Sequence, residues 1–245
     1  MPIDLRRLRQ LLARVFLSVP PAPHIPALFP IVTQTFNVTQ WGANIRALPS
    51  PSLGVVESIE FKKAIQSKQH EYLLVRVHHP DSARRAVFII HRCPSSVWRL
   101  MPSQSTSFPP VTSDMVTISP DGDEEKLVVD QHGMCETLGT LTFPVLRPSV
   151  LDLSTLLEVI NSHQPFYTVE ECKCYWYTGA IFDIMKLEFQ ARETYSPSAT
   201  LTRASYKGYV VKSEHATPTL RGEFTSKKEL YTRRAAEAVV SSCRF

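Results

Sequence analysis

A cysteine stands at the predicted start of a helix in the most informative stretch of this chain, Tyr167-Thr-Val-Glu-Glu-Cys-Lys-Cys174-Tyr-Trp-Tyr. Unpaired backbone N–H groups and the positive end of the helix macrodipole favour a thiolate at such a position. Cys174 is therefore the candidate nucleophile. The competing interpretation is structural, because free cysteine is among the most buried residue types.

A thiol nucleophile needs a base, and His70 is the candidate because it precedes the clearest strand in the sequence, 71–77. A second strand is predicted over 86–92 after a short segment with turn residues, so the two form an antiparallel hairpin. The hairpin places His91 close to His70. His91 could then orient His70 as the third member of a triad, and Glu71 is a possible substitute in that role.

The sequence predicts no metal site and no cofactor. Cys172 and Cys174 form a single C-x-C pair, and a zinc site would need two further ligands. The candidate ligands are His70, His78, His79, His91 and His132. None of them has the spacing of a zinc finger, and glycine-rich phosphate loops and other catalytic motifs are absent.

Composition fits a folded domain: 43% of the 245 residues are hydrophobic and 20% are charged. Five cysteines are too few for a disulfide-stapled secreted scaffold. The net charge of +4 is spread along the chain, so nucleic acid is not a predicted partner. No segment has transmembrane length, and we expect an intracellular, cytoplasmic protein.

The N-terminal segment 1–30 is predicted to combine an amphipathic helix with a proline-rich linker. The arginine-rich helix, over 1–19, either docks on the domain or acts as a mitochondrial presequence. Residues 31–245 are predicted to form one domain.

Within that domain the predicted strands precede most of the helices. Strands are expected at 31–38, 71–77, 86–92, 115–119, 126–130 and 137–143. Helices are expected at 151–162, capped by Asp152 or Ser154, at 174–189, and at 227–241, capped by Thr225 or Ser226. This order predicts an α+β fold with an antiparallel sheet packed against helices.

Two motifs of this chain resemble those of a group of uncharacterised proteins from mushroom-forming (basidiomycete) fungi. The first is His70-Glu-Tyr-Leu-Leu-Val-Arg-Val77, and the second is the 167–177 stretch that enters the Cys174 helix. The resemblance covers about residues 65 to 190.

The order of histidine first and helix-borne cysteine later is also similar to the circularly permuted papain-like hydrolases, the PPPDE and lecithin:retinol acyltransferase-like families. This resemblance implies a papain-like fold with His70, His91 and Cys174 as site residues. Lys173 departs from the Asn that precedes the cysteine in those families, and a nearby cation would lower the pKa of the thiol.

Residues and resemblance together predict a thiol hydrolase or acyltransferase. Cys174 would attack the carbonyl of a peptide, a ubiquitin-like isopeptide or an acyl ester, and His70 would take the thiol proton. The alternative is a non-enzymatic scaffold or pseudoenzyme of the same fold that acts in protein interaction.

Overall fold

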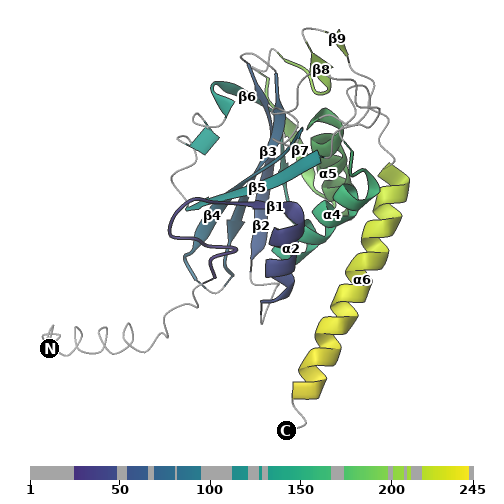
Figure 1. Ribbon diagram of the computed structural model, residues 1–245. Coiled ribbons are helices and arrows are strands. Elements are labelled where there is room, and N and C mark those ends of the chain that lie inside the picture. Colours follow the sequence, from purple (N-terminus) through teal and green to yellow (C-terminus); the bar gives the residue numbers. More distant parts are fainter. Residues whose placement is uncertain are drawn as a thin grey trace, which may run out of the picture.

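The computed structural model has a central antiparallel sheet with its main helices on one face (Figure 1). It describes residues 25–48, 54–65, 69–80, 82–94, 112–120, 127–128, 132–166, 174–197, 201–206, 209–210 and 217–242. The helix predicted over 1–19 lies outside these residues. Among the described helices, none combines the length and the apolar character needed to cross a membrane.

Seven strands form the main sheet in the order β1-β5-β4-β3-β2-β6-β7, and every neighbouring pair is antiparallel. The strands are β1 (Gln34–Asn37), β2 (Val55–Ala64), β3 (Glu71–His78), β4 (Arg85–Pro94), β5 (Thr112–Pro120), β6 (Cys135–Thr142) and β7 (Arg192–Tyr195). The helices are α2 (Val38–Arg46), α4 (Val150–His163), α5 (Cys174–Glu188) and α6 (Thr217–Ser242). A separate pair, β8 (Ser205–Tyr206) and β9 (Tyr209–Val210), forms a small hairpin. The predicted α+β class is confirmed.

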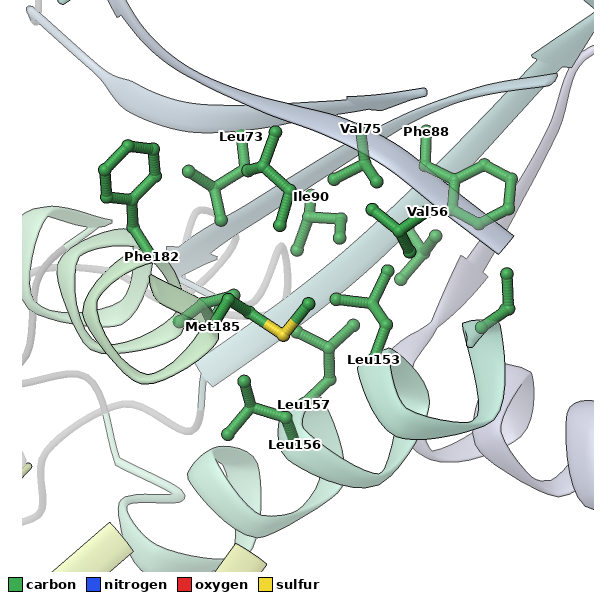
Figure 2. Close-up of a cluster of buried hydrophobic side chains, with 14 of the residues drawn as sticks. Val56, Leu73, Val75, Phe88, Ile90, Leu153, Leu156, Leu157, Phe182 and Met185 are labelled. Carbon is green, nitrogen blue, oxygen red and sulfur yellow. The ribbon is translucent and has the colours of Figure 1, made fainter. Parts of the chain in front are cut away.

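The central strands are apolar on both faces because both faces are covered. On β3, Leu73 and Val75 face α4 and α5, whereas Tyr72 and Leu74 belong to a second buried cluster on the opposite face. Figure 2 shows the first cluster between the sheet and the helices. The helices contribute Leu153, Leu156, Leu157, Phe182 and Met185 to it, all fully buried. Burial of each such side chain stabilises the fold by about 1.5–3 kcal/mol.

The predicted hairpin of strands 71–77 and 86–92 is confirmed as β3 and β4, with Leu73 opposite Ile90. The strands predicted at 115–119 and 137–143 are confirmed as β5 and β6, and the helix predicted at 174–189 as α5. The strand predicted over 126–130 is not found in its described part, because Leu127 and Val128 have helical backbone.

Residues 25–29 belong to the core rather than to a linker. Leu28 is fully buried, and Trp41 of α2 donates a hydrogen bond from Nε1 to the Ala27 carbonyl over 3.0 Å. Helix α2 was not expected from the sequence. It begins after Asn37, whose side chain accepts a hydrogen bond from the Gln40 amide and so caps the helix.

The N-termini of α4 and α6 differ from the prediction. Ser149 caps α4 in a capping box with Asp152, which is the third helical residue and not the cap. Helix α6 begins at Thr217, and the hydroxyls of Thr225 and Ser226 donate to carbonyls within the helix instead of capping it. The earlier start lets Leu220 and Phe224 pack into the core.

Candidate functional site

The hairpin brings His70 and His91 together, as expected from the turn length. His70 lies immediately before β3 and His91 lies near the end of β4, and the centroids of their rings are 5.5 Å apart. Both side chains are half-buried. They lie on the sheet face that carries Tyr72, the face opposite α4 and α5.

A third histidine, His132, completes the cluster from the connection between β5 and β6. Its ring centroid lies 5.3 Å from that of His70 and 5.3 Å from that of His91. One nitrogen of each imidazole lies within 4.8 Å of those of the other two. The sequence pattern did not place His132 here, because the strand that it predicted over 126–130 in this connection is not formed in the described part, where Leu127 and Val128 have helical backbone.

Two of the three imidazoles, those of His91 and His132, are uncharged at neutral pH. Burial lowers the pKa of His91 to about 4. Burial, and then the proximity of His91, lower the pKa of His132 to about 4. Both rings are therefore neutral at pH 7 and carry a free lone pair. Within the described residues, neither His91 Nδ1 nor His132 Nε2 has a hydrogen-bond partner, although both atoms are buried.

Tyr72 holds the histidines against an apolar wall. Its ring stacks on His132 with a centroid separation of 4.1 Å and an interplanar angle of 18°. Tyr72 also packs in the second buried cluster, whose other members are Leu74, Val87, Ile89, Leu127 and Val128. This apolar surrounding limits access of water to the imidazoles and fixes the ring of His132.

Cys174 begins α5 as predicted, but it lies in a different environment from the two histidines. The residue is 5% exposed, and it contacts Glu71 at the start of β3. Glu71 forms an ion pair of 2.9 Å with Lys63, and both of these side chains are fully buried. Consecutive residues of a strand point to opposite faces, so the sheet separates Cys174 and Glu71 from His70.

The predicted triad of Cys174, His70 and His91 is therefore not assembled in the structure. The Cys174 sulfur and the imidazole nitrogens of His70 and His91 do not all lie within 4.8 Å of one another. One nitrogen from each of His70, His91 and His132 does meet this distance. Burial raises the pKa of the Cys174 thiol to about 12 and outweighs the backbone N–H of Glu71, which lowers it. This is the reverse of the lowered pKa expected at a helix N-terminus. Tyr167, Cys172 and Lys173 lie outside the described residues.

We expect Cys174 to resist alkylation in the folded protein. With a pKa of about 12, roughly one thiol in 10,000 is ionised at pH 8, against roughly a quarter for a model thiol. Iodoacetamide labelling followed by peptide mass spectrometry measures this directly, with the half-buried Cys135 as an internal control. Cys174 should label only after denaturation. Labelling as fast as a model thiol in the native protein would contradict its burial and support the hydrolase prediction.

Comparison of the chain with protein-family models, curated proteins and solved structures gives no match. The functional argument therefore rests on the side chains of the site.

Proposed function

We propose that this protein binds a first-row transition-metal ion through His70, His91 and His132. The observation that carries the proposal is the convergence of three imidazole nitrogens within 4.8 Å of one another. Imidazole is a ligand for zinc, copper, iron and nickel. Metal ligands must be deprotonated, and the lowered pKa values of His91 and His132 supply two rings that need not lose a proton.

The spacing of the rings fits a metal centre after a small contraction. Zn–N bonds of about 2.0–2.1 Å separate the nitrogens of a tetrahedral site by about 3.4 Å. The upper limit of 4.8 Å between the present nitrogens is within reach of modest rotations of three half-buried rings. Three protein ligands would leave a coordination position for water or a further ligand.

Coordination would also satisfy buried polar atoms if the ion bonds to the nitrogens that now lack a hydrogen-bond partner. His91 Nδ1 and His132 Nε2 are buried without a hydrogen-bond partner among the described residues, and each such atom costs about 1–3 kcal/mol. An ion would bond to one nitrogen of each ring. It would join the segment before β3, the end of β4 and the β5–β6 connection.

The thiol hydrolase or acyltransferase function stays a prediction that rests on the sequence, as does the circularly permuted papain-like topology. Labelling of Cys174 tests the predicted function. The alternative of a non-enzymatic scaffold or pseudoenzyme of the same fold that acts in protein interaction agrees with a metal ion in a structural role, because structural ions stabilise folds without catalysis.

Titration with Zn²⁺, followed by native mass spectrometry and calorimetry, tests the proposal. We expect one ion per wild-type chain. Structural zinc sites contribute about 10–16 kcal/mol from four ligands, so loss of one ligand should weaken binding about 100-fold. His91→Gln and His132→Gln should each show this loss.

His163→Gln is the matched control, because His163 lies in the last turn of α4 beside Glu223 and away from the cluster. Its affinity for Zn²⁺ should equal that of the wild type. Circular dichroism of each variant confirms that the fold is retained. Unchanged affinity in folded His91→Gln and His132→Gln would place the ion elsewhere and refute the proposal.

A further inference from the structure

A thioether lies beside the histidine cluster on the neighbouring strand. Met115 of β5 is the direct cross-strand partner of His91 on β4. Directly opposed residues of an antiparallel pair share a face, with their Cβ atoms about 4.5–5.5 Å apart. Met115 is half-buried. Its flexible side chain, with three rotatable bonds, is long enough to reach an ion held by His91.

A thiol flanks the cluster on the same face. Cys93 lies two residues after His91, so both point to one side of β4. The β3–β4 pairing ends at Leu73 and Ile90, so Cys93 lies on the part of β4 beyond it, beside β5. Met115 is therefore placed beside His91 by strand pairing, and Cys93 by its position two residues further along the same face of β4.

Ser113 connects the two sulfur side chains. The Cys93 thiol donates to the Ser113 carbonyl with an Sγ–O distance of 3.4 Å. The Ser113 hydroxyl donates to Met115 with an Oγ–Sδ distance of 3.2 Å. These contacts hold both sulfur atoms along the β4–β5 side of the cluster.

We infer that the site selects copper(I) over zinc, with the Met115 thioether as the fourth ligand. The inference rests on the proposed three-histidine metal centre and adds the identity of its ion. Soft thioether and thiolate ligands favour Cu(I), whereas Zn²⁺ gains little from a neutral thioether.

The charge of the ligand set also favours copper(I) over zinc. Among the described residues, no Asp or Glu side chain joins the cluster, so the three histidines and Met115 would be a neutral set. The cost of placing an ion in a low-dielectric site rises with its charge, and the wall of Tyr72 and its apolar neighbours makes this site such an environment. A neutral set therefore favours a monovalent ion over a divalent one.

Competition with a chromophoric Cu(I) chelator under anaerobic conditions tests the inference, in parallel with Zn²⁺ calorimetry. Wild-type protein should bind Cu(I) more tightly than Zn²⁺. Met115→Leu should weaken Cu(I) binding at least about tenfold and change Zn²⁺ binding by less than about threefold. Leucine replaces methionine at similar volume, so the fold should be retained.

Met185→Leu is the matched control, because Met185 is a buried thioether of α5 on the other face of the sheet. It should leave both affinities unchanged. Since Cys93 offers a second sulfur, the double variant Met115→Leu/Cys93→Ser is measured as well. A loss of Cu(I) affinity only in the double variant would overturn Met115 as the fourth ligand and assign that position to Cys93.

The inference would be overturned if both Met115→Leu and Met115→Leu/Cys93→Ser bind Cu(I) as the wild type does. It would also be overturned if the wild type binds Zn²⁺ more tightly than Cu(I). The three-histidine centre would still stand if His91→Gln weakens Zn²⁺ binding. If folded His91→Gln binds both ions as the wild type does, the metal centre itself fails.

Discussion

Replacement of Arg92 by methionine is expected to lower the free energy of unfolding by about 3–5 kcal/mol. Arg92 follows His91 on β4 but points to the helix side of the sheet, where it pairs with Asp114 of β5. Its Nε and one terminal nitrogen donate to the two carboxylate oxygens over 2.7 Å each. The two side chains are 0% and 1% exposed.

The expected loss comes from the carboxylate that remains behind more than from the pair that is removed. Burial raises the pKa of Asp114, and Arg92 counteracts this by bonding the charged form. Without Arg92 the carboxyl group has to stay charged without a partner or take up a proton, and both cost free energy. The guanidinium also lies over the rings of Trp176 and Tyr177, at 5.3 and 4.6 Å, and these contacts are lost as well.

Urea denaturation of wild-type protein and Arg92→Met measures the change. The double variant Arg92→Met/Asp114→Leu should recover much of the loss, because an apolar pair leaves no buried charge. Arg221→Met is the matched surface control, since Arg221 is 49% exposed in its pair with Glu188, and it should cost about 0–1 kcal/mol. Equal losses of unfolding free energy in Arg92→Met and Arg221→Met would show that the buried ion pair contributes no more to stability than the exposed one.

The position of the histidine hairpin could be predicted from sequence because it depends on local signals. Apolar strand residues and turn residues specify β3 and β4, and antiparallel pairing then fixes His91 near His70. The start of α5 at Cys174 is equally local. The face of the sheet on which α5 packs is a tertiary property. It separates Cys174 from His70, and the sequence pattern of α5 carries no signal for it.

Other parts of the site and the fold could not be predicted from the sequence, because their local sequence signals were absent or misleading. The segment before His132 was predicted as a strand over 126–130 but has helical backbone at Leu127 and Val128, so only the folded chain shows that His132 meets His70 and His91. The first part of α6 was not predicted because Pro218 suggests a helix breaker. In the structure Pro218 lies in the first turn, where proline is tolerated. Helix α2 is short, and Gly42 weakens its helical signal.

Saturating Zn²⁺ is expected to raise the thermal midpoint of the wild-type protein by about 8–16 °C. A ligand at 1,000 times its dissociation constant stabilises the native state by about 4 kcal/mol. For a chain of this size, 1 kcal/mol moves the midpoint by about 2–4 °C. The physical reason is that His70, His91 and His132 belong to three segments that unfolding separates, so the complete site exists only in the native state.

Differential scanning calorimetry with Zn²⁺ or with EDTA measures the shift. His91→Gln should lose most of it, and His163→Gln should keep it in full. Binding of zinc to cysteines and histidines of the unfolded chain reduces the shift in all variants alike, so the difference between these two variants isolates the site. A shift of the same size in His91→Gln would mean that the stabilising ion binds away from the cluster. Such a result would remove the support for the metal centre and for copper selection by Met115 together.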